Sequence, residues 1–534
     1  MTSLALGSPA AVAVAEEASL SALLRCCVRE ISGPRGQVGH EDPYLLLRVA
    51  GTRLRVRAHG GLALRFEGRP EWLENGSWRP LSADVLVRLV ETELGEDNDE
   101  FAAQVAASRD AMAALIAARR EVPPPADPWL ASEQALVFGH PFHPSPKARG
   151  GEGWLRYAPE AHASFPLRLL GVRDDVLAEA GDSGSLDELG QAPPGYSLLP
   201  AHPWQLELLA AELAAPLADG RLVDLGDSAR RAVPTSSVRT VYEPLIDRCL
   251  KFSLDVRITN CLRKNSWYEL AGAVELSRRL EPVFLDLEAA FPGTRWLPEP
   301  GYRSAELGTR LLEGLGVIVR LGPWSVCRPG VTPLLSGALA AGRQGADAVP
   351  GDVPTMAGWP MADPVRWWRA YVERVAPPVL DAYLDHGVVL EPHLQNVLIG
   401  VDADGLPVEA VFRDLEGTKL VAGRHDLSGL PGRVAEALTY DAASGWNRVV
   451  YCLMVNHLAE IAASLAGTGS TRELWAVAGE VLAEYAASRG WPRPLSDLLS
   501  GAPLPAKANL SVRWARSADR SAGYVTVANP LATA

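Results

Sequence analysis

Cysteine is scarce in this sequence, and its pattern excludes the usual cysteine-based sites. The six cysteines are Cys26, Cys27, Cys249, Cys261, Cys327 and Cys452. None belongs to a C-x-x-C pair, and no Cys/His cluster has the spacing of a zinc site. Cys249 and Cys261 lie in an apolar-rich region, so we expect buried thiols. Reduced cysteines predict a cytoplasmic protein.

The sequence also lacks net positive charge. It contains 51 Lys and Arg and 64 Asp and Glu, which gives a formal charge of −13. Non-specific nucleic-acid binding depends on a basic surface, so the composition argues against a nucleic-acid partner. A locally basic pocket for a small anion remains compatible with this charge.

Long uncharged apolar runs are absent, since no such stretch reaches about 18 residues, and we expect no membrane span. The Ala/Val-rich run 4–15 has no basic residues before it and is followed by Glu16 and Glu17. That order argues against a secretory signal. We expect the first ~15 residues to form a disordered tail.

What the sequence does contain is an ordinary globular composition, with 48% apolar and 22% charged residues in 534 positions. This length suits three or four domain-sized units. Helices are predicted over 16–30, 83–120, 363–385, 434–465 and 471–489, and a β-hairpin or meander over 44–66. Boundaries are predicted at the Pro/Gly-rich stretches 122–128, 181–195 and 341–354. The fold class is α+β, without an internal repeat.

Residues 250–259 alternate strictly between apolar and polar side chains. Leu250, Phe252, Leu254, Val256 and Ile258 form the apolar set. The polar set is Lys251, Ser253, Asp255, Arg257 and Thr259. A strand places these two sets on opposite faces. Lys and Arg on a rigid strand suit phosphates or carboxylates, so the polar face predicts a site for an anion.

Two proline-rich loops carry histidines. Residues 139–150 hold His140, His143, Lys147 and an arginine among three prolines, which stiffen the loop. Such loops are frequent functional sites, although a structural loop with solvated basic groups remains an alternative. His140 and His143 lack an evident third metal ligand. In the second loop, His202 lies between prolines and is interpreted as structural.

Residues 234–240 collect four hydroxyl side chains and Arg239. Hydroxyls and a guanidinium are donors for an oxyanion. The stretch leads directly to Lys251. By itself it would be an ordinary Ser/Thr-rich loop.

The pattern of residues 390–417 predicts a β-hairpin with polar residues at its ends. Strands at 397–401 and 408–412 flank the turn 402–405, with Asn396 before the first strand and Asp414 after the second. Asn and Asp oxygens suit Mg²⁺ that arrives with substrate phosphates, and protein kinases use the same logic. A surface hairpin with acidic ends is the alternative. The late stretch 504–514, with Lys507, is uninformative alone.

Together these segments resemble the IucA/IucC family of synthetases, which build siderophores without a peptide-synthetase assembly line. The resemblance runs from about residue 98 to Trp514. It depends on G-H-P-x-H-P-x-x-K-x-R, S-x-R-T, K-x-S-L with T-x-x-x-R, E-x-H-x-Q-N and R-D-x-x-G, found in this order.

The resemblance implies a cupped hand. Its thumb would be residues 1–130, mostly helical with a small β-meander; its β-rich fingers would be 131–345; its distantly kinase-like palm would be 346–534. It also implies that ATP and Mg²⁺ activate a carboxylic acid, such as citrate or a derivative, as an acyl-adenylate. An amine, hydroxylamine or alcohol would then be acylated. A homodimer is expected from the family.

The resemblance assigns roles to individual residues. The ATP contacts implied are Ser237, Arg239, Thr240, Lys251, Thr259, Arg263, His393, Asn396 and Asp414. Mg²⁺ and phosphates would be held by Glu391, Asn396 and Asp414. The residues implied at the acid substrate or reaction centre are His140, His143, Lys147, Arg263, His393 and Lys507. The chemistry fits, because cations and Mg²⁺ must offset the repulsion when a carboxylate attacks a phosphate.

One departure stands out: Arg320 is followed by Leu321, where the family pattern has Glu. Two other functions stay open. One is a kinase-like phosphotransferase, against which stands the absence of a catalytic-loop Asp and a Gly-rich phosphate loop. The other is a binding protein that retains the fold. A ligase for a product that is not a siderophore is also open.

The alternating segment poses a geometric problem. On a straight strand, Lys251 and Thr259 would lie about 26 Å apart, too far to hold one phosphate. We therefore predict a break in this strand before Arg263, which brings both ends to one cleft.

Overall fold

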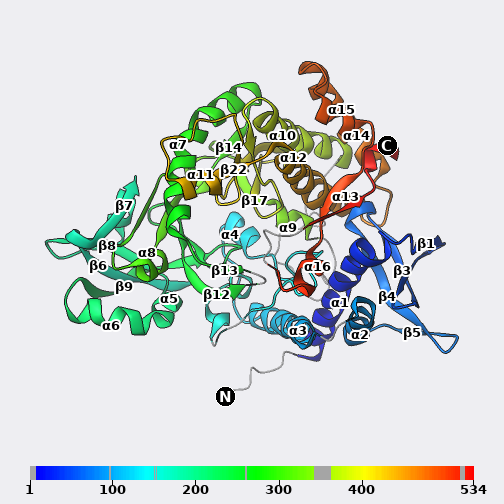
Figure 1. Cartoon of the computed structure of the whole chain (residues 1–534), viewed down its shortest axis with the longest axis horizontal. Coiled ribbons are helices and arrows are strands. Elements are labelled where there is room, and N and C mark those ends of the chain that lie inside the picture. The colour runs from blue at the N-terminus through cyan, green and yellow to red at the C-terminus, as the bar shows by residue number, and fades with distance from the viewer. Residues whose placement is uncertain are drawn as a thin grey trace.

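The computed structural model describes residues 8–95, 98–149, 151, 153–258, 261–341, 363–517 and 523–533, without the side chains of 257–263. Helices and sheets are mixed along the chain (Figure 1), in agreement with the predicted α+β class. Thr259, the side chain of Arg263 and residues 342–354 of the third predicted boundary lie outside the described residues.

The N-terminal part begins with a helix where a tail was expected. Helix α1 (Pro9–Cys26) continues into a π-helical turn, η1 (Cys27–Ser32). The Ser8 hydroxyl accepts a hydrogen bond from the Ala11 N–H (3.4 Å), and Pro9 occupies the first helical position. The prediction of a disordered tail is therefore wrong from residue 9 onward, because a serine cap followed by proline starts a helix here.

The predicted meander is confirmed and is longer than expected. Five antiparallel strands pair in chain order: β1 (Val38–Glu41), β2 (Tyr44–Val49), β3 (Thr52–His59), β4 (Arg65–Glu74) and β5 (Ser77–Pro80). The single helix predicted over 83–120 is instead two, α2 (Ala83–Leu94) and α3 (Asp99–Arg119). Gly95 ends α2 at a left-handed φ of 79°, and Asn98 caps α3 by accepting from the Phe101 N–H.

An antiparallel eight-stranded sheet carries the middle of the chain, in the order β7-β15-β16-β11-β10-β9-β6-β8. Its strands are β6 (Phe165–Arg173), β7 (Leu177–Gly181), β8 (Tyr196–Ala201), β9 (Leu222–Pro234), β10 (Thr240–Glu243), β11 (Arg248–Phe252), β15 (Gly301–Ala305) and β16 (Val317–Leu321). The helices of this region are α4 (Pro128–Glu133), α5 (Pro203–Leu208), α6 (Ala210–Ala218), α7 (Trp267–Ala290), α8 (Thr309–Gly314) and α9 (Ser336–Ala340).

The predicted break in the alternating segment is confirmed. Strand β11 ends at Phe252, and β12 (Leu254–Ile258) turns back on β13 (Cys261–Arg263) as a separate hairpin, with Leu254 opposite Arg263. Ser253 lies at the break, where its hydroxyl bonds Glu313 O and accepts from the Asn265 N–H (2.8 Å). These side-chain bonds replace the ladder that a continuous strand would need.

The C-terminal part is built on a four-stranded sheet in the order β14-β20-β19-β17. Its strands are β14 (Thr294–Trp296), β17 (Thr332–Leu335), β19 (Val397–Val401) and β20 (Pro407–Phe412). The antiparallel β19/β20 pair is the predicted hairpin. A smaller sheet joins β18 (Val388–Val389), β21 (Lys419–Val421) and β22 (Thr439–Tyr440).

Helices surround this sheet (Figure 1). They are α10 (Pro364–Leu384), α11 (Gly432–Leu438), α12 (Ala442–Val450), the π-helical η9 (Tyr451–Leu458), α13 (Ala459–Ala466), α14 (Arg472–Ser488) and α15 (Arg493–Leu499). Two predicted helices, 363–385 and 471–489, match α10 and α14. The third, 434–465, is wrong as a single helix, because β22 pairs with β21 and separates α11 from α12.

The helical stretch Ala442–Ala466 is long and apolar enough to cross a membrane by length and composition. Within the protein, 78% of its apolar 18-residue window is buried. Its apolar side chains belong to the large core that also contains Trp368, Tyr371 and Trp475. Burial against other helices therefore accounts for its apolar composition.

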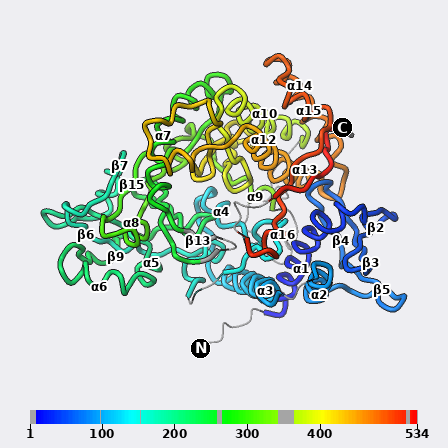
Figure 2. The backbone as a smooth tube through the Cα atoms, in the orientation of Figure 1, coloured from blue at the N-terminus to red at the C-terminus, as the bar shows by residue number. Residues whose placement is uncertain are grey.

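The end of the chain returns to the N-terminal part (Figure 2), through β23 (Leu504–Lys507), α16 (Asn509–Trp514) and β24 (Tyr524–Val527). The Glu30 carboxylate in η1 accepts from the N–H groups of Leu510 (2.9 Å) and Ser511 (2.8 Å). Arg65 donates to Ala340 O (2.8 Å) and pairs with Glu460 (3.0 Å). These contacts hold the N-terminal part against segments that come much later in the sequence.

Replacing Trp368 with alanine should lower the free energy of unfolding by about 3–5 kcal/mol. Trp368 is fully buried in the C-terminal core, and its Nε1–H donates to Leu474 O (2.6 Å). Urea unfolding followed by circular dichroism measures the loss. The matched control is Trp491→Ala, since Trp491 is 52% exposed and its removal should have little effect. Equal losses in the two variants would contradict this view of the core.

Candidate active site

Two ion-paired residues from distant segments form the centre of the site. The Lys251 Nζ, on β11, lies 2.7 Å from Asp414 Oδ1, just after β20. It also lies 3.1 Å from Glu416 Oε2. Lys251 is 2% exposed. Asp414 has a left-handed backbone (φ 73°), which Asp tolerates better than most residues and which turns the chain sharply after the strand.

Arginines from two further segments complete this cluster. Arg320 on β16 donates to Glu299 and lies 3.2 Å from Asp414. Arg239 donates to Asn265 Oδ1 (2.7 Å) and pairs with Glu416. We call these seven residues the ion cluster: Arg239, Lys251, Asn265, Glu299, Arg320, Asp414 and Glu416.

The electrostatics of the ion cluster keep its groups charged. Burial alone would raise the pKa of Asp414, but Lys251 and Arg320 hold it well below its usual range. Burial alone would lower the pKa of Lys251, but Asp414, Glu299 and Glu416 raise it. An opposite charge within a few ångströms favours the charged form of each partner. The site therefore presents permanent positive charge beside a carboxylate.

Sheet pairing brings the S-x-R-T stretch to Lys251. Thr240 on β10 is the direct partner of Lys251 on β11, and the Phe252 N–H donates to Arg239 O (2.9 Å). Ser237 O accepts from the Thr240 N–H (3.0 Å), which closes the preceding turn. The structure thus places Ser237, Arg239, Thr240 and Lys251 together, as the resemblance implied.

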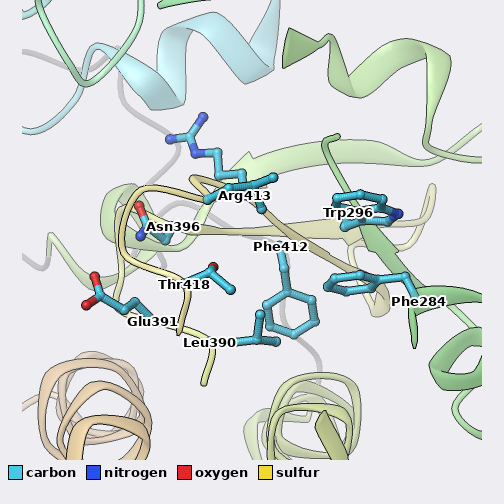
Figure 3. Close-up of a pocket in the computed structure, with 9 residues that line it drawn as sticks. Phe284, Trp296, Leu390, Glu391, Asn396, Phe412, Arg413 and Thr418 are labelled. Atoms are coloured by element: carbon cyan, nitrogen blue, oxygen red, sulfur yellow. The ribbon is translucent and has the colours of Figure 1, made fainter. Parts of the chain in front are cut away.

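The segment 391–396 precedes β19 and lies at the same end of the β19/β20 hairpin as Asp414. Asn396 O accepts from the Arg413 N–H (3.1 Å), so Asn396 and Asp414 lie at the two adjoining strand ends. In Figure 3, Glu391, Asn396 and Thr418 lie on one side of a small pocket, and Phe284 and Trp296 on the other. The Glu391 carboxylate is paired with Arg448.

Gly417 explains why the R-D-x-x-G motif ends in glycine. A Cβ at this position would lie 2.1 Å from Glu391 Oε2. Any larger residue would therefore displace the Glu391 side chain or the loop after Asp414.

A second buried ion pair, which the sequence did not predict, aligns three motifs. Arg413 binds the Glu133 carboxylate with both terminal nitrogens (2.6 and 3.0 Å). Glu133 also accepts from the Ser236 N–H (3.0 Å). Gln395 O accepts from Arg413, and the Gln395 amide donates to Ser236 O (3.1 Å). Bidentate pairing of this kind gives geometric specificity.

His457 was also missed by the sequence analysis. It is fully buried in η9, and its Nδ1 contacts Pro392 O at 2.7 Å. Its Nε2 contacts the Tyr371 hydroxyl, which in turn bonds Ser336 Oγ (3.1 Å). Because Pro392 O can only accept, Nδ1 carries the proton. His457 thus supports the segment between Glu391 and His393.

The histidine-rich loop faces the same region. His143, Arg29, His393 and Lys507 lower the pKa of His140 well below its usual value, after the larger effect of burial. Arg29 lies over the Phe142 ring, 3.2 Å from its centroid. The Asn509 amide donates to Phe142 O (2.9 Å), which ties the loop to the Lys507 segment. His140, His143, His393 and Lys507 therefore share one electrostatic neighbourhood.

Lys147 has a different environment. Its amine pairs with the fully buried Glu160, which also binds Arg149 Nη2 (2.6 Å). Burial alone would raise the pKa of Glu160, but Arg149 and Lys147 lower it to about 2. In this structure Lys147 holds the base of the loop. His202 is buried, in agreement with its structural interpretation.

Candidate metal ligands are few in the described part of the chain, which contains no group of three or more His, Cys, Asp and Glu side chains suited to a metal ion. Asp414 and Asn396 still fit Mg²⁺ brought by phosphates, because that ion commonly uses one or two protein oxygens. Glu391 is in the same position as Asp414, because both carboxylates already pair with basic side chains, Glu391 with Arg448 and Asp414 with Lys251 and Arg320.

The structure also shows what balances the charge of Arg320, where the sequence departs from the family pattern. Arg320 has no following Glu, yet Glu299 binds its guanidinium and is itself fully buried. A carboxylate from another segment thus balances Arg320.

Comparison with known proteins shows similarity over most of the chain. Residues 128–341 match the IucA / IucC family, and residues 365–522 match the ferric iron reductase FhuF-like transporter family. The middle of the chain is thus similar to the IucA/IucC family. The first matched region contains His140 to Arg320, and the second contains His393 to Lys507.

Individual proteins that are similar to this chain have names from siderophore and citrate chemistry. It is 29% identical to the rhizobactin siderophore biosynthesis protein RhbC of Rhizobium meliloti, over 76% of this chain and 75% of that protein. It is equally similar, with the same coverage, to the L-2,3-diaminopropanoate–citrate ligase of Staphylococcus aureus. The fold resembles ATP-bound aerobactin synthetase IucA of Klebsiella pneumoniae, with a TM-score of 0.81, 24% identity and coverage of 96% and 99%.

The buried Glu160 predicts acid sensitivity. Its pKa is about 2 when folded and 4.5 in its ordinary state, so its stabilisation is present above pH 4.5 and is lost as the pH falls toward 2. Between pH 5 and pH 3, the free energy of unfolding should fall about 2 kcal/mol further in the wild type than in Glu160→Gln. Urea titrations at the two pH values measure this difference.

The matched control is Glu17→Gln, on the exposed side of α1, which should lose as much stability as the wild type over this range. If Glu160→Gln also loses as much as the wild type, the carboxylate is not held by Lys147 and Arg149 as described.

Proposed function

We propose that this protein is an ATP-dependent synthetase that activates a carboxylic acid as an acyl-adenylate and transfers the acyl group to an amine. The observation that carries the proposal is the ion cluster, in which Lys251 and Arg320 pair with Asp414 and Arg239 pairs with Glu416. Citrate ligases and siderophore proteins among the relatives support citrate or a derivative as the acid and an amine as the nucleophile.

In the first step, an oxygen of the substrate carboxylate attacks the α-phosphorus of ATP, and pyrophosphate leaves. Both reactants are anions, so nearby cations must offset their repulsion. Lys251, Arg239 and Arg320 supply this charge, and Ser237 and Thr240 add hydroxyl donors. Thr259 and Arg263 remain proposed ATP contacts from the family resemblance. Asn396 and Asp414 would hold Mg²⁺ on the phosphates, and Glu391 remains a proposed contributor.

In the second step, the amine attacks the acyl carbon, the bond to AMP breaks, and the proton lost by the amine nitrogen passes to solvent. His140, His143 and His393 share a feature that bears on this step: each Nδ1 accepts a backbone N–H two residues later, at 3.0, 3.1 and 3.3 Å. In a neutral imidazole the proton must then be on Nε2. Burial lowers the pKa of His140 and of His393, which favours that neutral form.

These histidines are therefore N–H donors. Donors suit the oxygens of a carboxylate or of the oxyanion that forms at the acyl carbon. A base would need a free ring nitrogen, and the backbone already occupies Nδ1. We assign them orientation and oxyanion stabilisation, with Lys507 as a further positive charge. Lys147 would act through the shape of the loop.

The finer architecture also belongs to this proposal. The thumb, fingers and palm would be residues 1–130, 131–345 and 346–534. Apolar clusters support this division in part, since one is formed mostly by residues 20–105 and another by residues 111–319. Helix α7 departs from it, because Leu276 to Leu287 pack in the C-terminal core. A cytoplasmic location is supported by buried free cysteines, including Cys26 and Cys249. A homodimer stays a prediction.

Pyrophosphate release should depend on a carboxylic acid, and hydroxylamine should trap the activated acyl group as a hydroxamate. A screen of citrate, citrate monoamides, succinylated hydroxamates and other dicarboxylates, each with and without diamines and amino acids, identifies both substrates. Formation of AMP supports adenylation. Formation of ADP alone would instead support a kinase-like phosphotransferase, which the Asn396 and Asp414 hairpin otherwise leaves open.

Lys251→Met and Asp414→Asn should each lower acid-dependent pyrophosphate release by about 10²–10³-fold, because each removes a preorganised charge. Asp219→Asn is the matched control, since Asp219 forms an exposed ion pair with Arg221 and should leave the rate unchanged. Thermal unfolding identifies any variant that has lost its fold. Wild-type rates in both folded variants would refute the site assignment.

A further inference from the structure

A second pocket lies behind the ion cluster and is not used in the mechanism above. It is bounded by α7 and α11, which lie side by side (Figure 1), and by the chain that follows Asp414. Its polar lining includes Lys251, Glu269, Glu299, Glu416 and Lys419. Its apolar lining includes Ala273, Leu276, Ile318 and Leu438.

One buried oxygen in this pocket has no partner. Glu299 is fully buried, and its Oε1 accepts from Arg320 Nε (2.8 Å). Its Oε2 has no hydrogen-bond partner among the described residues. An unsatisfied buried carboxylate oxygen is costly, so a ligand or water that donates a hydrogen bond should bind there.

The charged residues that line the pocket limit which hydrogen-bond donors can bind there. Three carboxylates, from Glu269, Glu299 and Glu416, face the pocket. The charge of Lys251 is already offset by Asp414 (2.7 Å) and Glu416 (3.1 Å). Lys419 donates to Glu416 O (2.8 Å), and burial lowers its pKa. Glu299 is likewise paired with Arg320, and Glu416 with Arg239, so these two carboxylates add little net charge. A carboxylate ligand has no hydrogen to donate to Glu299 Oε2, whereas an ammonium group brings three N–H donors and is attracted by Glu269.

The size of the pocket limits the ligand further. Its volume is about 60 Å³. A cavity of about 150 Å³ holds a benzene ring, so this pocket takes an aminoalkyl group and not a purine base. Its apolar wall suits a short aliphatic chain.

We propose that this pocket binds a primary ammonium group on an aliphatic chain, with Glu299 and Glu269 as acceptors. The ammonium group could come from the amine co-substrate, in which case the site rests on the proposed function, or from a separate amine effector. Either source would act next to Lys251 and Glu416, which belong to both the pocket and the ion cluster.

Direct binding tests the site without ATP, so its failure differs from failure of the proposed ligase activity. Ligand-observed NMR on the full chain at neutral pH would measure n-propylamine, with n-propanol as the neutral analogue and propionate as the anionic one. We expect n-propylamine to bind about tenfold more tightly than either, as for hydrogen bonds between charged groups. Equal binding of n-propanol, or no binding of n-propylamine, would overturn the proposal.

Two variants with matched controls test the location. Glu269→Gln should weaken n-propylamine about tenfold, and glutamine can still serve in the capping box that starts α7. Glu281→Gln, on the exposed side of α7, should not change binding. Gly272→Ala should also weaken binding, because its methyl group enters the pocket 3.5 Å from Leu438.

The control for Gly272→Ala is Gly479→Ala in α14, whose added methyl would likewise meet a leucine, at 3.6 Å. Alanine favours a helix over glycine, so both variants should fold. Unchanged affinity in Glu269→Gln and Gly272→Ala would overturn the proposal. In turnover assays, competition between n-propylamine and the amine co-substrate would assign the pocket to that substrate. An effect independent of co-substrate concentration would assign it to an effector.

Discussion

The contact between Lys251 and Asp414 is the constraint on which the rest of the site depends. It joins the eight-stranded sheet to the β19/β20 hairpin, two structures that the chain builds separately. The Lys251 charge could not be buried alone without a large loss of solvation, because Lys251 is only 2% exposed. Asp414, whose side chain is 34% exposed, pairs with it, and Arg320, Glu299, Arg239 and Glu416 balance the two charges. Three basic groups are thus matched by three carboxylates where anionic substrates would meet.

Around this contact, the loops of the site are held by backbone hydrogen bonds. His140, His143 and His393 each bind a backbone N–H, so their rings are oriented before any substrate arrives. Two π-helical turns add support: η1 places Arg29 over Phe142, and η9 places His457 on Pro392. Single-turn π-helices are frequent at functional sites, because they shift a side chain relative to its helix. Rigidity of this kind is what transition-state stabilisation requires.

Much of the local structure followed from sequence pattern. The hairpin at 397–412 was predictable because apolar strands flank the turn Asp402 to Gly405, and both signals are local. The break near Ser253 was predictable from the reach of a strand. The single helix expected over 434–465 failed because the two-residue strand β22 forms only by pairing with β21. Likewise, Glu133 could not be recognised as a residue of the site, because its partner Arg413 is 280 residues away in the sequence.

The sequence by itself determined the ordered motifs, and with them the family resemblance and the choice of candidate residues, because motif spacing reflects short-range geometry. It also determined that a strand break was needed. Tertiary structure alone decided which charges neutralise each other: Glu299 on Arg320, Glu160 on Lys147 and Arg448 on Glu391. It also created the pocket between α7 and α11. Electrostatic energy depends on distance and burial, and only packing of remote segments sets those two quantities.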